Sequence, residues 1–369
     1  MSALLVALVG WLAFSVSYRL LASASLIRMC EPQAGAADPR TPPGTVVALR
    51  PLHGAGRQLE SCLDSLWRAA KASRMRIVVA MADAGDGAAA VVARVRERWP
   101  ETACRVAIGE GPSGINRKVS NQVQAVRGEH ADFWLLSDAD VRVPDDYAQR
   151  LLAPFSDSGV GLATCPYVSV PAATVVSRID ALVTNTHFIP NACLAARFEG
   201  LHFGLGATIA VRDEALAQIG GLASLLDLAA DDFWLARKIE AAGWRLAWVP
   251  LVVEHALEDE GWQDALARHV RWSRVTRASR PAGYFGSIVT QDLPPALACA
   301  AALAAAGGPG WAVLLGWWAL RAGVAWSRRE LVRFRLRDVW LLPIVDLAAL
   351  GVWVGGLFGS AEPPRGHAG

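Results

Sequence analysis

Two aspartates separated by one residue are the first candidates for chemistry in this chain. Asp138 and Asp140 follow an apolar segment that ends at Leu136. If that segment is a strand, residues two apart project to the same side of it. Two adjacent carboxylates repel each other unless they hold a cation. Mg²⁺ or Mn²⁺ is the natural one, because such hard ions take oxygen ligands and bridge phosphates. The alternative is an Asp-rich turn, which is a common loop composition.

A glycine turn leads into a polar helix start at residues 114–121, where Asn116 and Lys118 are close in sequence. The amide groups of a helix N-terminus and a nearby lysine suit a phosphate. The alternative is a solvated surface helix. The segment is not a Walker loop, and the G-x-G fragments that begin at Gly54 and Gly204 lack the context of a dinucleotide-binding turn.

Two adjacent acids, Asp231 and Asp232, precede an amphipathic helical segment that ends near Glu240. Helix capping explains one carboxylate and is the simpler interpretation, but it does not explain why two acids sit side by side. The alternative is a general base, which needs one carboxylate within reach of an alcohol proton.

A basic and aromatic motif, RHVRW, occupies residues 268–272. In a helix, Arg268, Arg271 and Trp272 share one face. Arginine suits bidentate contact with phosphate, and tryptophan offers a flat surface to a sugar or base. Three further arginines continue the basic run: Arg274, Arg277 and Arg280. A membrane-surface helix that meets anionic lipid is therefore the alternative, and both roles suit different parts of the segment.

The elements that must position these residues alternate between strand-like and helix-like patterns. Strands are predicted at 45–52, 76–82, 104–108 and 132–136, with helices at 57–73 and 87–99. This alternation predicts an α/β domain with a mostly parallel sheet and helices on both faces. Ligands of such sheets bind beyond the carboxyl ends of the strands. Asp83, Asp138 and Asp140 follow predicted strands and are expected at that edge.

The composition indicates that part of the chain lies in a membrane. Only 19% of the 369 residues are charged and 53% are apolar, whereas a soluble protein carries about 25% charged residues. The net charge of +2 is too balanced to indicate a nucleic-acid partner. The six cysteines are scattered without a C-x-x-C pair, which favours buried thiols in a reducing compartment over disulfides.

Four apolar segments are candidate membrane spans. Residues 3–27 are long enough to cross about 30 Å of hydrocarbon. Basic residues follow this segment and do not precede it, which favours a retained anchor over a cleaved signal peptide. Three more segments lie at 289–306, 309–327 and 338–359, and the first of them is alternatively re-entrant or interfacial.

Charged residues near these segments predict the orientation of the chain. Arginines follow the first span and fill the loop between the last two, whereas residues 307–310 are uncharged. By the positive-inside rule, the chain starts outside, residues 28–290 are cytoplasmic, and three more crossings follow. Within the spans, Arg321 is expected to snorkel towards one end. Asp346 must face other helices or pair with a cation.

In chain order, these motifs resemble those of a known group of enzymes. Asp83, the Asp138/Asp140 pair, Asp232 and RHVRW at 268–272 resemble the D, D-x-D, D, (Q/R)-x-x-R-W series of processive and lipid-modifying glycosyltransferases of the GT-A fold. Finer detail looks like the ceramide glucosyltransferase family, whose bacterial branch includes the hopanoid glycosyltransferases. That detail lies at 51–54, 114–121 and 206–212, and 280–284 resembles the hopanoid branch in particular.

The resemblance covers residues from about Val46 to Leu297 and implies an organisation for the whole chain. A transmembrane anchor is expected at 1–27. A Rossmann-like GT-A domain with interfacial helices is expected at 44–285, and C-terminal transmembrane helices at 289–359. Together with the orientation predicted from the arginines, the resemblance implies an integral protein of a bacterial inner membrane whose catalytic domain is cytoplasmic.

The resemblance further implies roles for individual residues. The nucleotide-sugar donor would be bound by Asp83, Asp138, Asn116, Lys118 and Arg268, and Asp140 with Asp138 would hold Mg²⁺ or Mn²⁺. The catalytic residues would be Asp232 as general base, with Arg271 and Trp272 contacting the diphosphate and the acceptor; His187 would lie near the acceptor. The family often has Glu before the base where this chain has Asp231, so either aspartate remains a candidate for the base.

The function expected from this resemblance is inverting transfer of a hexose or N-acetylhexosamine. The donor would be a UDP-sugar and the acceptor a hydroxyl of a membrane lipid of the ceramide or hopanoid type, presented by the bilayer. A processive polysaccharide synthase of the cellulose or hyaluronan type is the nearest alternative. A non-catalytic membrane scaffold and a metal-dependent phosphohydrolase are others.

Overall fold

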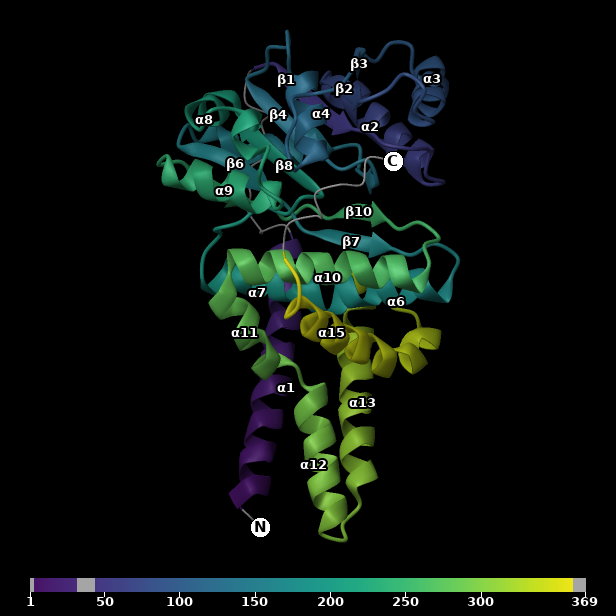
Figure 1. The fold of residues 1–369 in the computed structure, drawn as a ribbon, viewed down its shortest axis with the longest axis vertical. Coiled ribbons are helices and arrows are strands. Elements are labelled where there is room, and N and C mark those ends of the chain that lie inside the picture. The colour runs from purple at the N-terminus through teal and green to yellow at the C-terminus, as the bar shows by residue number, and fades with distance from the viewer. Residues whose placement is uncertain (1–2, 32–43, 361–369) are drawn as a thin grey trace. The chain divides into compact units, whose positions relative to one another are not determined.

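The structure is a computed structural model that describes residues 3–31 and 44–360. Its chain forms two compact units, shown as ribbons in Figure 1. The first, called the helical unit, comprises Met1–Arg28, Pro171–Leu194 and Asp259–Ala361. The second, called the sheet unit, contains Met29–Val170 and Ala195–Glu258. Each predicted site residue can therefore be assigned to one unit.

A seven-stranded sheet is the framework of the sheet unit. Its strands are β1 (Val46–Pro51), β2 (Arg76–Met81), β3 (Cys104–Ile108), β4 (Phe133–Ser137), β6 (Val160–Thr164), β8 (Thr208–Arg212) and β9 (Arg245–Trp248). They are ordered β3-β2-β1-β4-β8-β6-β9. Only β8 runs antiparallel to its neighbours. The mostly parallel sheet predicted from the sequence is confirmed, and the four predicted strands lie within two residues of the observed ones.

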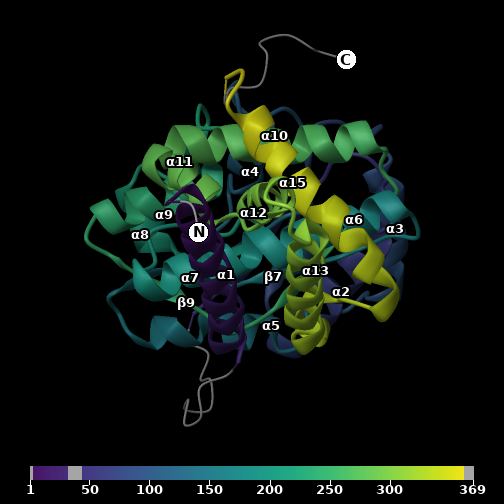
Figure 2. The same ribbon diagram turned by 90° about the horizontal axis from the view of Figure 1, so that it is seen from below.

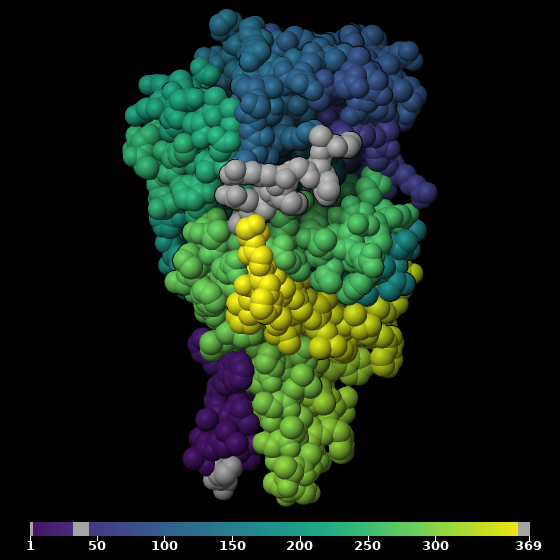
Figure 3. All heavy atoms as spheres, viewed as in Figure 1, coloured from purple at the N-terminus to yellow at the C-terminus, as the bar shows by residue number. Residues whose placement is uncertain are grey.

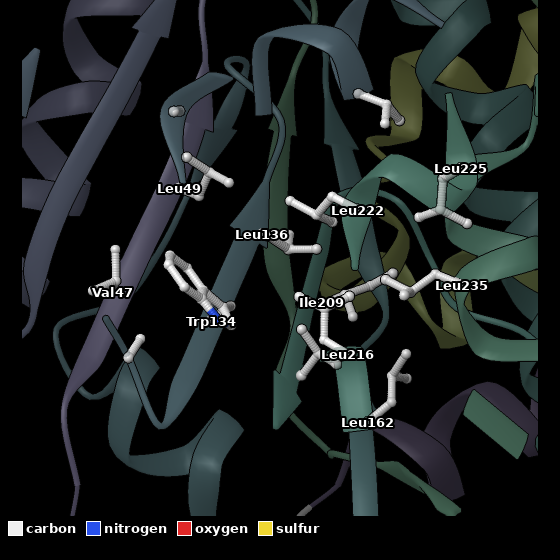
Figure 4. Close-up of a cluster of buried hydrophobic side chains, with 14 of the residues drawn as sticks. Val47, Leu49, Trp134, Leu136, Leu162, Ile209, Leu216, Leu222, Leu225 and Leu235 are labelled. Carbon is white, nitrogen blue, oxygen red and sulfur yellow. The ribbon is translucent and has the colours of Figure 1, made fainter. Parts of the chain in front are cut away.

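Apolar side chains on one face of this sheet form the core shown in Figure 4. Val47, Leu49, Trp134 and Leu136 contribute from β1 and β4, which pair in parallel. Helices α4 (Arg117–Ala125), α8 (Asp213–Gln218) and α9 (Asp231–Ala241) contribute the opposing residues. On the other face, helix α2 (Leu59–Ser73) buries its apolar side against the rest of the sheet unit. Because this packing fixes the first turns of α4 and α9, it also fixes their polar N-terminal residues.

A second, three-stranded sheet in the same unit has the order β5-β10-β7. These strands are β5 (Val141–Arg142), β7 (Tyr167–Val170) and β10 (Val253–Ala256). Strand β5 begins directly after Asp140, and its Val141 lies opposite His255 of β10. This register places a histidine from a distant part of the chain beside the Asp138/Asp140 turn.

The helical unit consists of helices throughout its described residues. They are α1 (Ala3–Cys30), α6 (Val175–Val183), a π-helical turn (Thr184–Phe188), α7 (Ile189–Phe198), α10 (Trp262–Ser279), α11 (Pro281–Thr290), α12 (Leu293–Ala305), α13 (Gly310–Ser327), α14 (Arg329–Val332), a 3₁₀ turn (Leu336–Leu341) and α15 (Leu342–Gly356). α7 ends in residues of the sheet unit. Apolar contacts join α1, α12 and α13 through Leu12, Leu293 and Trp317.

Three helical segments of the described chain are long and apolar enough to cross a membrane: Ala3–Cys30, Pro281–Ala305 and Leu336–Gly356. The predicted span at 309–327 forms α13 but is not among these three, and it contains Arg321. Seen from below in Figure 2, α12 is viewed end-on whereas α15 runs across the view. α15 also lies at the surface of this unit, as Figure 3 shows, and exposes Leu347 and Val354. The unit therefore has apolar surface suited to lipid.

Two expectations for charged residues in these segments can be compared with the structure. Asp346 is buried and lies 3.0 Å from Arg321 and 3.2 Å from Arg19, so the prediction that it faces other helices or pairs with a cation is confirmed. Arg321 was expected to snorkel but is 1% exposed, because Asp346 and Thr186 accept its hydrogen bonds inside the unit. All six cysteines are free thiols; five are buried and Cys104 is partly exposed.

Candidate active site

Lys118 is the centre of a charged cluster in the sheet unit. Its Nζ atom is 2.7 Å from Asp138 Oδ1 and 3.0 Å from Asp231 Oδ2. Burial alone would lower the pKa of Lys118, but the two carboxylates raise it well above its ordinary value. The cluster thus joins the turn after β4 to the first turns of α4 and α9. These three segments are far apart in the sequence and were separate motifs there.

Asn116 ties the same two helices together. It is the N-cap of α4, where its side-chain oxygen accepts a hydrogen bond from the Val119 amide. Its side-chain nitrogen donates to Asp231 Oδ1 at 3.2 Å. The glycine turn before it approaches another backbone closely, since a Cβ atom on Gly114 would lie 2.9 Å from the Leu226 carbonyl oxygen. Asn116 is therefore engaged in positioning Asp231, and the glycine permits that contact.

Asp232 differs from its neighbour Asp231 in having no basic partner. Its Oδ1 atom accepts a hydrogen bond from the Phe233 amide at 2.8 Å, and no described side chain forms an ion pair with it. Burial, followed by the adjacent charge of Asp231, raises the pKa of Asp232 to about 6. A Cβ atom on Gly206 would lie 3.0 Å from Asp232 Oδ2. Asp232 is therefore a carboxylate able to exchange a proton near neutral pH.

Asp140 lies on the other side of the same turn and faces His255. Its Oδ2 atom is 3.3 Å from His255 Nε2, whereas its Oδ1 atom is buried without a hydrogen-bond partner. Burial would raise the pKa of Asp140, but the imidazole outweighs this effect and lowers it. Burial raises the pKa of Asp138 despite the Lys118 charge. No three His, Cys, Asp or Glu side chains of the described chain converge as a metal-binding group.

This donor set nevertheless fits a divalent cation. The unpartnered oxygen of Asp140 and the imidazole nitrogen of His255 are two ligands of the kind that Mn²⁺ accepts. The remaining coordination positions would be filled by oxygens of a diphosphate and by water, as is usual for ions bound together with a nucleotide.

The motif analysis missed two residues near the Asp138/Asp140 turn: His255 and Arg50. Arg50 lies in β1, is fully buried, and donates to the Ser137 hydroxyl at 2.8 Å and to the Val141 carbonyl at 2.9 Å. It therefore holds both ends of the turn that carries Asp138 and Asp140. The signal in the sequence was an arginine inside a continuous apolar strand, a position that seldom accepts a charge.

Asp83 lies apart from the Lys118 cluster. It follows β2, is exposed, and accepts a hydrogen bond from the Gly85 amide at 2.9 Å. The neighbouring Asp86 accepts hydrogen bonds from the Gly54 amide and so joins the loops after β1 and β2. No described hydrogen bond or ion pair connects Asp83 to the cluster.

The RHVRW motif belongs to α10 of the helical unit. Arg268 forms ion pairs with Asp180 and Glu260. Arg271 is exposed and forms no hydrogen bond or ion pair with any described residue, and Trp272 is partly exposed. Arg268 is thus already neutralised, whereas Arg271 is available to a ligand.

Other residues of the basic run, and His187, have partners within the helical unit. Arg274 and Arg277 donate to the backbone carbonyls that end α15, those of Leu357, Phe358 and Gly359. They are therefore engaged by protein, although the sequence suggested lipid as their alternative partner. His187 Nε2 lies 2.7 Å from Asp346 Oδ1.

Two solved structures are similar to this chain, and the first of them shows which fold it has. A mannosyltransferase from Pyrobaculum calidifontis, PcManGT, is similar with a TM-score of 0.62 at 20% identity, over 96% of this chain and 99% of that one. Glucosyl-3-phosphoglycerate synthase from Mycobacterium tuberculosis matches with a TM-score of 0.39 at 11% identity, over 64% of this chain and 79% of that one. The first match confirms the predicted GT-A-like α/β fold with its mostly parallel sheet.

The sequence itself matches a family over nearly its whole length. Residues 6–367 match the family described as Glycosyl transferase family 21. The matched region includes the Lys118 cluster, Asp140, Asp232 and the RHVRW motif. This chain therefore belongs to Glycosyl transferase family 21, the ceramide glucosyltransferase family that the order of its motifs resembles.

Proposed function

We propose that the protein is an inverting glycosyltransferase that moves a hexose or N-acetylhexosamine from a UDP-sugar to a hydroxyl of a membrane lipid. Family membership supports glycosyl transfer; the donor, the acceptor and the stereochemistry are the proposal. The observation that carries it is Asp232, a carboxylate without an ion pair whose pKa is raised to about 6 beside the Lys118 cluster. Such a group is suited to accept the proton of an alcohol.

In the proposed reaction, Asp232 accepts the proton of the lipid hydroxyl. The hydroxyl oxygen attacks the anomeric carbon and forms the new C–O bond, while the bond from that carbon to the diphosphate oxygen breaks on the opposite face. The configuration at the anomeric carbon is therefore inverted, and the electron pair leaves with the nucleoside diphosphate. Asp231 supports this step by holding Lys118 and Asn116.

Donor binding is assigned to residues of several of the sequence motifs. Asp83 and Asp138 would contact the nucleoside, and Lys118 with Asn116 would face the phosphates. Arg271 takes the diphosphate contact that the motif also suggested for Arg268, because Arg268 is paired with two carboxylates. Trp272 is assigned to the acceptor side.

A divalent cation is assigned to Asp140, with His255 and Asp138 as further candidate ligands. Bound there, Mg²⁺ or Mn²⁺ would neutralise the charge that develops on the leaving diphosphate. The Pyrobaculum mannosyltransferase was solved with GDP-Man and Mn²⁺, which supports a metal-dependent nucleotide-sugar site. It also makes a GDP-sugar the donor to be tested against UDP-sugars.

A lipid acceptor is supported by the three apolar helical segments of the helical unit. If the lipid tail stays in the bilayer, only its hydroxyl has to reach the donor. A ceramide or hopanoid alcohol meets this requirement, and so does any other lipid with an accessible hydroxyl near the membrane surface.

The donor and acceptor can be tested together. Purified full-length protein in nanodiscs is incubated with labelled UDP- and GDP-sugars and with ceramide or hopanoid lipids, and the products are analysed by mass spectrometry. A glycolipid carrying one sugar, with inverted anomeric configuration, is expected from a UDP-sugar. A long polymer would support a polysaccharide synthase, and no turnover of any donor would support a scaffold.

Metal dependence is tested by removing the metal and its ligand. Asp140→Asn should lower turnover by at least about 10²-fold, the usual loss when stabilisation of a leaving group is removed. Excess chelator should abolish activity, and Mn²⁺ or Mg²⁺ should restore it. The matched control is Asp145→Asn, five residues after Asp140. It changes an exposed carboxylate that pairs with Arg68 and should leave turnover unchanged. Full activity in chelator would contradict the metal assignment.

A further inference from the structure

Asp180 is a buried carboxylate of the helical unit that the proposed mechanism does not use. It lies on α6 and is 6% exposed. One of its oxygens, Oδ1, lies 2.6 Å from Nε2 of His269, and the other accepts a hydrogen bond from Arg268. Burying a carboxylate is costly unless it is paired and hydrogen-bonded. Both of the partners named here come from the RHVRW motif of α10.

Both of those partners also contact the ring of Trp272. The His269 imidazole meets it edge to face, with ring centroids 5.2 Å apart and an interplanar angle of 79°. The Arg268 guanidinium lies over it at 6.0 Å from the centroid. Residues three and four positions apart are neighbours on a helix surface, so these contacts follow from the spacing of the motif. One carboxylate thus holds the two side chains that flank Trp272.

The hydrogen bond also selects the tautomer of His269. Because an ionised carboxylate only accepts hydrogen bonds, the proton must be on Nε2. This bond fixes the plane of the imidazole, and the fixed edge then limits the orientations open to the Trp272 ring. Arg268 is constrained further by Glu260. Trp272, which is itself partly exposed, therefore lies against a rigid polar support.

We propose that Asp180 is a positioning residue that fixes the orientation of Trp272 through His269 and Arg268. The inference rests on the proposed function in one respect, the assignment of Trp272 to the acceptor side. If Trp272 is presented to the acceptor in one orientation, loss of Asp180 weakens productive acceptor binding while donor binding is retained. Asp180 itself touches neither substrate nor reacting atoms in this account.

A matched pair elsewhere in the same unit separates positioning from general stability. Arg178, also on α6, lies 3.0 Å from Asp338, whose side chain is fully buried. Asp338→Asn therefore breaks a buried carboxylate–arginine pair that involves α6, as Asp180→Asn does, but it leaves the neighbours of Trp272 unchanged. A purely structural role for Asp180 predicts the same behaviour from both variants.

The experiment reads the Trp272 ring directly, in full-length protein labelled with 5-fluorotryptophan. The ¹⁹F resonance of Trp272 is assigned by its absence in Trp272→Phe. Asp180→Asn is expected to shift or broaden this resonance, and Asp338→Asn to leave it in place. An unchanged resonance in Asp180→Asn, or an equal change in both variants, would overturn the proposal.

Kinetics supply a second measurement that depends on the proposed function. Asp180→Asn should raise the KM for the lipid acceptor at least tenfold, while the Kd for UDP measured by calorimetry changes less than twofold. His269→Gln, which can still donate to Asp180 but lacks the ring, should reproduce this pattern if Asp180→Asn does not fold. Because Asp180 and His269 belong to one hydrogen-bonded network around Trp272, the Asp180→Asn/His269→Gln double variant should be no worse than the more severe single variant; additive losses would contradict the proposal.

These readouts distinguish the two hypotheses. If wild-type protein transfers no sugar to a lipid, the proposed function fails, and the ¹⁹F comparison still decides the role of Asp180. If wild-type protein is active but Asp180→Asn has normal acceptor kinetics and an unchanged Trp272 resonance, only the positioning role fails.

Discussion

At the scale of single residues, the two adjacent acids at the start of α9 have different environments. Asp231 bonds to Lys118 and Asn116, whereas Asp232 has only a backbone amide as hydrogen-bond donor. From the sequence alone either one could be the base, and helix capping accounted for one of them. Asp232 is favoured as the proposed base because it has no basic partner, whereas both oxygens of Asp231 are already held by Lys118 and Asn116.

We therefore predict that Asp232→Asn lowers kcat by about 10²- to 10⁴-fold, the usual contribution of general-base catalysis. Donor affinity should be nearly unchanged, because the proton is taken only in the transition state. Asp231→Asn, the matched neighbour, should lose much less kcat and should weaken donor binding through Lys118. Steady-state kinetics and UDP calorimetry on both variants test this, and the reverse order of losses would reassign the base to Asp231.

The raised pKa of Asp232 gives a prediction for pH dependence. The base must be ionised to accept a proton, and its pKa is about 6. Thus kcat/KM should be constant above this pH and fall on the acid side, approaching tenfold per pH unit below it. Asp231→Asn removes a neighbouring negative charge. This removal stabilises the ionised form of Asp232, so the acid limb of the pH profile should move to lower pH. A limb that moves to higher pH in this variant would contradict the assignment.

Glycine residues of the site show what motif analysis could not resolve. In the sequence, the G-x-G fragment at Gly204 lacks the context of a dinucleotide-binding turn, and its purpose is not apparent. In the structure, Cβ atoms on Gly204 and Gly206 would lie 2.9 Å from the Asp232 carbonyl oxygen and 3.0 Å from its Oδ2 atom, respectively. Small residues here allow the close approach of a side chain from α9. Such an approach depends on tertiary packing and leaves no local signal.

At the scale of elements, the strands that could be predicted are those with continuous apolar sequence. β1, β2 and β4 are largely buried in a parallel sheet, and such strands read as short Val- and Leu-rich runs. β3 is the edge strand and is only partly buried. β5 and β10 could not be predicted, since β5 has two residues and β10 is the tetrapeptide VEHA. They exist because they pair with each other across more than 100 residues. His255 was missed for this reason, as it becomes a candidate ligand only through that pairing.

A buried ionic network connects four helices of the helical unit. Asp292, at the start of α12, bonds to Arg19 of α1 at 2.5 Å, and Asp346 of α15 bonds to both Arg19 and Arg321 of α13. These two aspartates and two arginines balance each other in an environment where an isolated charge would be very costly. The pairing explains how arginine and aspartate are accommodated in otherwise apolar helices.

Removing one member of this network should destabilise the protein markedly. Asp292→Ala leaves Arg19 with fewer partners, and breaking a buried pair typically costs about 3–5 kcal/mol. A clear fall in Tm is expected in thermal unfolding of the detergent-solubilised protein. Asp145→Asn, which affects an exposed pair with Arg68, should leave Tm nearly unchanged because surface pairs contribute little. Equal Tm values for the two variants would show that the network does not contribute to stability.

At the scale of the whole molecule, the placement of arginines predicted a membrane topology. The contacts made at the two ends of α15 change that prediction. The sequence suggested that 338–359 crosses the membrane as a fourth span. In the structure, the carbonyls of Leu357 and Phe358, directly after α15, accept hydrogen bonds from Arg277 and Arg274 of α10. Before its N-terminus, Asp338 pairs with Arg178 of α6. Both ends of α15 are thus bound to helices of the segment predicted to be cytoplasmic.

We therefore predict that α15 enters and leaves on the same side of the membrane, as an interfacial or re-entrant helix. The helical segment Leu336–Gly356 is long and apolar enough to cross, so the prediction rests on the partners of its two ends. A crossing would have to separate these ends from the arginines that bind them, and arginine side chains are retained on the cytoplasmic side. The chain would then cross at α1, α12 and α13, although α13 is not among the three described segments that are long and apolar enough to span.

Single cysteines in a cysteine-free background can test this arrangement with a membrane-impermeant maleimide. Gly308→Cys, between α12 and α13, should be labelled in intact spheroplasts. Glu330→Cys, before α15, and Ser360→Cys, after it, should both be labelled only when the membrane is opened. If Ser360→Cys were labelled from outside while Glu330→Cys was not, α15 would be a true span and the fourth crossing would be restored. If Gly308→Cys were protected in intact cells and Glu330→Cys labelled, the orientation itself would be reversed, and a nucleotide-sugar donor from the cytoplasm could not reach the sheet unit.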